Sequence, residues 1–120
     1  MISRKVESFQ DLVVWQKSHQ LAIELSKFKI SKKENESLVN MIRDAVILIP
    51  LNISIGFRKR SKKAKLHFYR LALTSLQELA YLLILADDLE YIKNYDELKE
   101  ESETIDRMLK RLIRSNTPNK

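Results

Sequence analysis

Residues 44–78 read DAVILIPLNISIGFRKRSKKAKLHFYRLALTSLQE, and the fold is decided within this stretch. No carboxylate lies between Asp44 and Glu78. The first part, Ala45–Phe57, is uncharged, and the second part carries seven cations, namely Arg58, Lys59, Arg60, Lys62, Lys63, Lys65 and Arg70. An apolar segment followed directly by a basic one predicts a buried helix that ends in a basic turn at the surface.

The apolar part belongs to a long expected helix. Ser31 and Glu34 match the S-x-x-E capping box, so a helix is expected to begin near Lys32 and to continue to about Arg58. From Ala45 onward its apolar residues cover nearly the whole circumference, which requires burial on more than one side. Since each helix of a monomeric four-helix domain buries only one stripe, the pattern predicts an oligomer.

The basic part is expected to lead into a second long helix. Ser61 is a suitable N-cap, and the helix is expected over residues 62–89. Its apolar residues recur every seven positions, as is typical of the seam of a helical bundle. The two series that show this spacing are Tyr69, Leu76 and Leu83, and Ala72, Leu79 and Ala86.

Two further amphipathic helices are expected outside this pair. Ser8 and Asp11 match a capping box that precedes a helix over 11–28, and Asn94 is expected to cap a peripheral helix over 95–115. Because short connections between long helices favour antiparallel neighbours, the fold class is expected to be all-α, an up-down-up-down antiparallel four-helix bundle. The expected division of the chain is an N-terminal arm, the bundle and a C-terminal tail, over residues 1–8, 9–115 and 116–120.

Three residues within the helices have expected structural roles. Trp15 is expected to be a core or interface anchor, because its large ring favours burial. Asn52 lies in an apolar setting and is expected to satisfy a helix terminus or a broken backbone hydrogen bond. Gly56 suits either a close approach of two helices or a helix end.

The composition narrows the classes of function. One glycine leaves no glycine-rich phosphate loop, and one glycine with two prolines leaves too few turn residues for an all-β fold. There is no cysteine, and His19 and His67 form no Glu-x-x-His pair, so neither a metal nor a cofactor is expected. With no catalytic constellation, the chain is expected not to be an enzyme. The longest uncharged run is shorter than the roughly 20 residues that span a bilayer, so a cytoplasmic protein without a membrane partner is expected.

The net charge of +6 is unevenly distributed along the chain. Residues 45–77 carry seven basic residues and no acid, whereas residues 87–106 carry nine acids against Lys93 and Lys99. Lysine and arginine neutralise phosphates, so the cations from Arg58 to Arg70 are candidates for contact with RNA or DNA.

The same cations also suit roles that involve no nucleic acid. They are compatible with a solvated turn between helices, or with a surface that pairs with the acids of a neighbouring subunit, in which case the protein is a purely structural interaction module. The rings of Phe68 and Tyr69 would stack on bases if exposed, although packing in the core explains them as well.

Three segments resemble one protein family. Residues 9–22, FQDLVVWQKSHQLA, resemble the motif F-E-D-L-x-V-W-Q-K, and residues 42–61, IRDAVILIPLNISIGFRKRS, resemble R-x-A-x-x-S-I-P-x-N-I-A-E-G-x-x-R. Residues 75–92, SLQELAYLLILADDLEYI, resemble S-L-x-E-L-x-x-x-L-x-x-A. These motifs belong to the small bacterial proteins encoded in intervening sequences of 23S ribosomal RNA genes, the S23 family. The likeness is collinear and covers nearly the whole chain.

The resemblance implies a four-helix bundle that assembles as a cyclic homo-oligomer, with pentamers among the family's forms. The related accessory proteins of diversity-generating retroelements are basic and pentameric and bind nucleic acid, which favours a role in RNA or DNA binding. This chain departs from the pattern at Ser54 and Ile55, which replace Ala-Glu before the glycine, so no role of that glutamate carries over. The positions that match the family's marked residues, beside Arg58, are Trp15, Arg43, Pro50, Asn52, Gly56 and Glu78.

Overall fold

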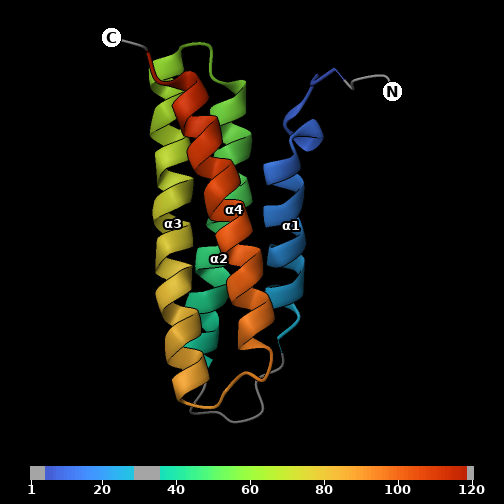
Figure 1. Cartoon of the computed structure of the whole chain (residues 1–120), viewed down its shortest axis with the longest axis vertical. Coiled ribbons are helices and arrows are strands. Elements are labelled where there is room, and N and C mark those ends of the chain that lie inside the picture. Colours follow the sequence, from blue (N-terminus) through green and yellow to red (C-terminus); the bar gives the residue numbers. More distant parts are fainter. Residues whose placement is uncertain (1–4, 29–35, 119–120) are drawn as a thin grey trace.

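The computed structural model describes residues 5–28 and 36–118, and within them the protein is all-helical, as predicted. A short 3-10 helix precedes four α-helices that lie side by side along the longest dimension (Figure 1). In chain order the elements are η1 (Phe9–Asp11), α1 (Val13–Ser26), α2 (Glu36–Arg58), α3 (Lys62–Asp88) and α4 (Tyr95–Asn116).

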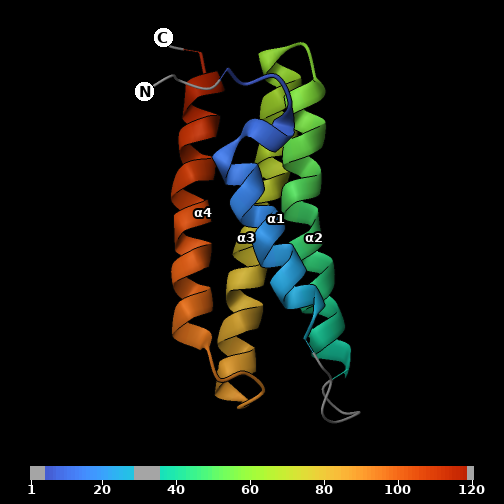
Figure 2. The same ribbon diagram turned by 90° about the vertical axis from the view of Figure 1, so that its right-hand side faces the viewer.

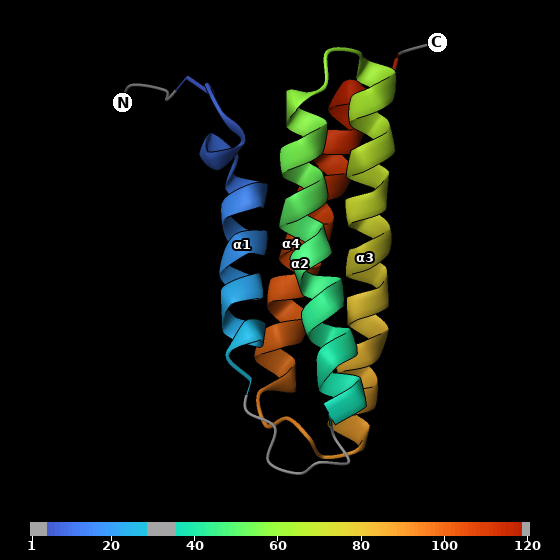
Figure 3. The same cartoon turned by 180° about the vertical axis from the view of Figure 1, so that it is seen from behind.

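Each helix packs against the next one in the chain, and α1 also packs against α4, so the four helices enclose one core. The link between α2 and α3 lies at one end of the molecule, as does the C-terminal end of α4 (Figures 1 and 3). The link between α3 and α4 lies at the opposite end. Figure 2 shows η1 on the α2 side of the molecule, toward the end that holds the α2–α3 link, and η1 contacts α2.

The heptad residues of α3 form the predicted seam. Each of the six is at most 2% exposed, and the side chain of Tyr69 is among the largest that are fully buried. α4 contributes a single buried stripe of Leu98, Ile105 and Leu109, while most of its other residues are exposed or half-buried. The prediction of a peripheral helix with a solvated outer face is therefore confirmed.

The N-terminal helix begins differently from the prediction. Ser8 and Asp11 do form a capping box, but it caps the short η1. Leu12 then adopts an extended conformation, with φ −75° and ψ 124°, and α1 starts after it. The helix predicted over about 11–28 is therefore present as α1, but it covers Val13–Ser26, and the separate 3-10 turn over Phe9–Asp11 was not predicted. The physical reason is that η1 turns aside to pack its Phe9 ring against Trp15.

Two other capping predictions have different outcomes. The hydroxyl of Ser61 accepts a hydrogen bond from the Ala64 backbone N–H at 3.1 Å, so Ser61 caps α3 as expected. Asn94 is the N-cap residue of α4, so the predicted start of this helix is confirmed, but its side chain makes no capping hydrogen bond. Its backbone has φ −110° and ψ 38°, outside the extended region from which capping side chains usually reach the first turn. The cap expected at 31–34 and the helix start near residue 32 lie outside the described residues.

α2 is buried on its inner side only. Pro50 lies within the helix and is buried, together with residues such as Ile49 and Ile53. By length and composition alone α2 and α3 would each suit a membrane span, but core helices of soluble proteins meet the same criteria. Four large apolar side chains on the outside of α2 are between 39% and 48% exposed. We call them the outer stripe: Met41, Ile47, Leu48 and Leu51.

Gly56 marks a very close approach of α2 to α3. A Cβ atom at this position would lie 2.7 Å from Cε1 of Tyr69 and 3.1 Å from Cβ of Phe68. Only a residue without a side chain fits here without displacing the Tyr69 ring. Of the two roles predicted for Gly56, close helix approach is confirmed.

Candidate nucleic-acid interface

The link between α2 and α3 presents the cations that the sequence singled out. α2 ends at Arg58 and α3 begins at Lys62, so the link between them is only three residues long. Arg70 is also exposed, further along α3. We call the five exposed cations at the link the basic turn: Arg58, Lys59, Arg60, Lys62 and Lys63.

Lys65 has a different environment from the other cations of the predicted site. Its side chain is half-buried, and its Nζ donates to the backbone carbonyl of Phe57 at 2.6 Å and lies 3.5 Å from that of Gly56. Carbonyls in the last turn of a helix lack partners within it, and the helix dipole favours a cation there. Lys65 therefore stabilises the end of α2, and its charge is engaged by that contact.

Cations and aromatic rings alternate around the basic turn. Three cation–aromatic contacts occur among the described residues, each 5.2 Å from the ring centre, within the range of a favourable cation–π interaction. The pairs are Arg58 with Phe9, Lys59 with Phe68, and Lys65 with Phe57. Of the two rings considered for base stacking from the sequence, Tyr69 is buried in the core and Phe68 is half-buried under Lys59.

A column of rings continues from Arg58 along α1. Phe9, which lies under Arg58, meets Trp15 edge-on with ring centres 5.1 Å apart. Trp15 in turn stacks on His19 at 4.6 Å, with 13° between the ring planes. Phe9 and Trp15 are half-buried and His19 is exposed; we call these three residues the aromatic column. The sequence predicted Trp15 as a core or interface anchor but gave no sign of the column, because only the docking of η1 on α2 brings Phe9 to Arg58.

Three other positions that match the family's marked residues lie outside the basic turn: Arg43, Asn52 and Glu78. Nη2 of Arg43 donates to the backbone carbonyl of Phe28, which lies two residues after the end of α1. This hydrogen bond connects α2 to the C-terminal end of α1. Nδ2 of Asn52 donates to the carbonyl of Leu48 at 2.9 Å, one turn earlier in α2. Asn52 thus pairs with the backbone, but with a carbonyl inside α2 and not with the helix terminus or broken backbone bond that was expected. Glu78 is exposed on α3.

The two ends of the bundle differ in charge. A second group of exposed cations lies on the C-terminal half of α4, which runs toward the end that holds the basic turn (Figures 1 and 2). These residues are Arg107, Lys110, Arg111 and Arg114, of which Lys110 pairs with Asp106 at 2.9 Å. The opposite end holds the last residues of α3, Asp87 and Asp88, and the α3–α4 link with Glu90 and Lys93.

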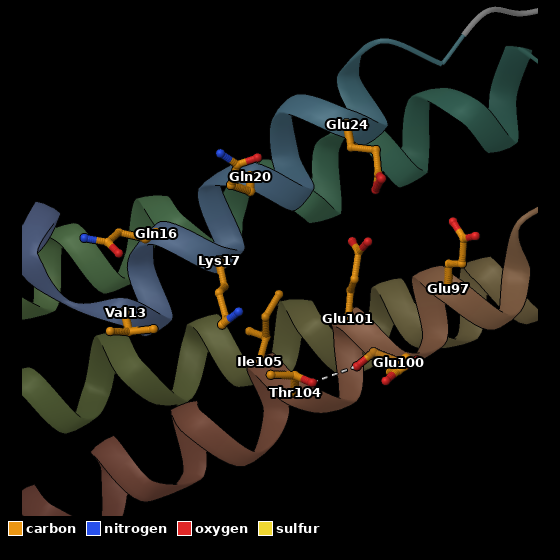
Figure 4. Close-up of a pocket in the computed structure, with 10 residues that line it drawn as sticks. All are labelled: Val13, Gln16, Lys17, Gln20, Glu24, Glu97, Glu100, Glu101, Thr104 and Ile105. Atoms are coloured by element: carbon orange, nitrogen blue, oxygen red, sulfur yellow. Dashed lines mark hydrogen bonds between the residues drawn. The ribbon is translucent and has the colours of Figure 1, made fainter.

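A groove of about 600 Å³ separates α1 from α4 and is lined mainly by polar side chains. Glu24 on α1 points toward Glu101 on α4, and Lys17 also reaches into the groove (Figure 4). Partial desolvation of its carboxyl raises the pKa of Glu101 from the ordinary value of a glutamate, although the residue keeps an exposed surface. Repulsion by Glu24, a hydrogen bond with Glu24 and repulsion by Glu97 act in the same direction, whereas Lys17 lowers this pKa. Across residues 5–28 and 36–118, no group of histidine, aspartate and glutamate side chains is arranged to hold a metal ion.

Comparison with known families gives a match over most of the chain. Residues 10–111 match the family described as 23S rRNA-intervening sequence protein. The chain belongs to this family. The resemblance drawn from the three sequence motifs is thereby confirmed.

A solved structure shares the fold of this 23S rRNA-intervening sequence family member. It is the crystal structure, at 1.70 Å resolution, of a protein with unknown function from the S23 ribosomal protein family from Bacteroides thetaiotaomicron VPI-5482. The two chains are 24% identical and superpose with a TM-score of 0.78, over 85% of this chain and 96% of the other. At this identity the similarity shows a common fold. The search of curated proteins gave no match.

Proposed function

We propose that this member of the 23S rRNA-intervening sequence family is a non-enzymatic, oligomeric scaffold of the cytoplasm that binds RNA or DNA through its basic turn. The observation that carries the proposal is the exposure of five cations at one short link, within a stretch of sequence that has no carboxylate from residue 45 to residue 77. Cations at this density displace counterions from phosphates. The resulting affinity depends little on the nucleotide sequence and falls as the salt concentration rises. The cations of α4 extend the same positive end.

The oligomeric part of the proposal is supported by the outer stripe of α2. Large apolar side chains that are grouped on one exposed helix face favour burial against another protein surface. We propose that a second copy of the chain covers the stripe, in a cyclic homo-oligomer of up-down-up-down antiparallel bundles, and that the assembly is the pentamer implied by the family resemblance. Such a ring would repeat the basic turn, so several weak phosphate contacts would act together.

The salt dependence of RNA affinity tests the proposal. In one variant, Lys62→Gln and Lys63→Gln remove two charges from the basic turn; in the matched control, Lys93→Gln and Lys99→Gln remove two exposed charges away from it. Fluorescence anisotropy of a labelled RNA should show a slope of log affinity against log salt that is smaller by about one unit per lost phosphate contact in the first variant. The control should keep the wild-type slope. Equal slopes in the two variants, or no affinity in the wild type, would contradict the proposal.

The alternative is a purely structural protein–protein interaction module with no nucleic-acid ligand. The opposite charges at the two ends of the bundle favour it, because the basic turn of one copy would complement the acidic end of another. Under this alternative, Lys62→Glu with Lys63→Glu would reduce the mass of the assembly in native mass spectrometry. The wild-type protein would then bind no RNA at any salt concentration.

A further inference from the structure

We propose that the nucleic acid bound at the basic turn is single-stranded, and that its unpaired bases stack on the aromatic column of Phe9, Trp15 and His19. This inference rests on the proposed function. It adds the form of the ligand and a second contact surface, on α1, that the basic turn alone does not provide.

The column is continuous with the basic turn. Arg58 is exposed, and its guanidinium lies 5.2 Å from the centre of the Phe9 ring, so one residue belongs to both surfaces. Ring contacts then lead from Phe9 through Trp15 to His19. A strand whose phosphate reaches Arg58 therefore has a row of aromatic side chains directly beside it.

One step of the column, from Trp15 to His19, resembles part of a base stack, whereas Phe9 meets Trp15 edge-on at 64°. The rings of Trp15 and His19 are nearly parallel, with 13° between their planes, and His19 at the end of the row is exposed. The other histidine contact at this end of the bundle is different. His67 meets Phe68 at an interplanar angle of 83°, which gives an edge contact rather than a flat stack. The surface on α1 is therefore the better platform for a base.

Base stacking selects for unpaired strands. In a duplex the faces of the bases are covered by their neighbours, so rings on a protein surface gain nothing from them. In a single strand the faces are accessible, and proteins that bind single strands combine a positive surface with aromatic rings that stack on successive bases. Because the basic turn and the aromatic column meet at Arg58, both parts of that combination are present here.

The fluorescence of Trp15 reports on the column directly, since it is the one tryptophan of the chain. Wild-type protein is titrated with unlabelled oligouridylate and, separately, with an RNA duplex that has the same number of phosphates, at one salt concentration. The single strand is expected to quench Trp15 and to bind on the order of tenfold more tightly than the duplex, because each base stacked on a ring contributes to affinity.

A substitution at the exposed end of the column separates stacking from charge. His19→Ala should weaken single-strand binding on the order of tenfold and leave duplex binding unchanged, and His19→Phe should restore the affinity by restoring a ring. Gln20→Ala is the matched control, because Gln20 is on the same helix but lines the groove toward α4. It should behave as the wild type does.

The outcomes distinguish this inference from the proposed function. Equal affinity for single strand and duplex, without quenching of Trp15 and without an effect of His19→Ala, would overturn the inference and leave the proposed function standing. Absence of binding to either RNA would overturn both.

Discussion

Gly56 has no side chain, and this allows α2 and α3 to approach each other closely. A Cβ at position 56 would lie 2.7 Å from the ring of Tyr69, which is 2% exposed and has no room to move aside. Gly56→Ala gains about 1 kcal/mol in helix propensity, but overpacking a core costs about 1–3 kcal/mol. We expect a net loss of about 1 kcal/mol in the free energy of unfolding, measured by urea denaturation.

Ser54→Ala is the control for this prediction. It lies one half-turn away on the same helix, removes only the hydroxyl that donates to the Leu51 carbonyl, and should change stability by less than about 0.5 kcal/mol. If the Gly56→Ala protein were as stable as the wild type, α2 and α3 would be able to move apart and accommodate the methyl group without loss of stability.

Lys65 is expected to act on stability and not on ligand binding. Lys65→Met keeps the apolar stem but removes the hydrogen bond to the Phe57 carbonyl, so unfolding should become easier by about 1 kcal/mol. The salt slope of RNA binding should stay at the wild-type value, in contrast to the Lys62→Gln and Lys63→Gln variant. A reduced slope with unchanged stability would instead assign Lys65 to the interface.

At the scale of elements, the stability that the packing of α1 against α4 provides should depend on pH. The raised pKa of Glu101 means that the folded protein holds this proton more tightly than the unfolded chain does. Stability therefore falls as pH rises from the usual pKa of a glutamate through the raised value. Glu101→Gln removes the ionisation, so the variant should be more stable than the wild type at neutral pH.

Urea unfolding at mildly acidic and at neutral pH measures this effect. The difference in stability between the two conditions should shrink in Glu101→Gln. Glu103→Gln is the control, because Glu103 is exposed on the same helix and does not line the groove between α1 and α4. If Glu101→Gln kept the full pH dependence of the wild type, the facing carboxylates of the groove would not be its cause.

Structural features that depend only on residues close together in the chain were predictable from the sequence. The heptad spacing of Tyr69, Leu76 and Leu83 gave the buried seam, and the hydroxyl of Ser61 gave the start of α3, because periodicity and capping are local properties. The break at Leu12 was not predictable, since it depends on where the Phe9 ring packs after η1 has docked.

The same distinction applies to the candidate interface. A run of cations predicts an exposed basic turn, because charged side chains are rarely buried, and five of the seven cations lie there. From the sequence, Lys65 was predicted to have the same role as its neighbours, since the sequence does not show that its Nζ turns back to the end of α2. The aromatic column was missed because it joins Phe9 to Arg58, two residues that are far apart in the chain.

At the scale of the whole molecule, the outer stripe of α2 should control the assembly. Leu48→Glu with Leu51→Glu places two carboxylates where we propose that another copy packs, and burying unpaired charges costs several kcal/mol. Sedimentation velocity should show the wild type well above the chain mass of 14.2 kDa and the variant close to it.

Lys99→Glu serves as the control for assembly. Lys99 is exposed on α4, which packs against α3 and α1, so the substitution lies away from the outer stripe. It should leave the sedimentation of the wild type unchanged. A wild-type protein that sediments at 14.2 kDa would mean that the exposed stripe is not covered by another copy.

Among the described residues, the basic turn and the cations of α4 lie toward one end and Asp87, Asp88 and Glu90 toward the other, and this separation of charge contributes an electric dipole moment along the bundle. The bundle is 48 Å long, whereas charges in physiological salt are screened within about 8 Å, so each end acts on its surroundings independently. Rotation about an axis parallel to the helices carries every basic end to the same side, which would make a plate with one cationic face. A two-fold axis across the helices would place the basic ends on opposite sides and cancel the moment. A parallel ring of any subunit number would therefore attract a polyanion to one face in preference to the other.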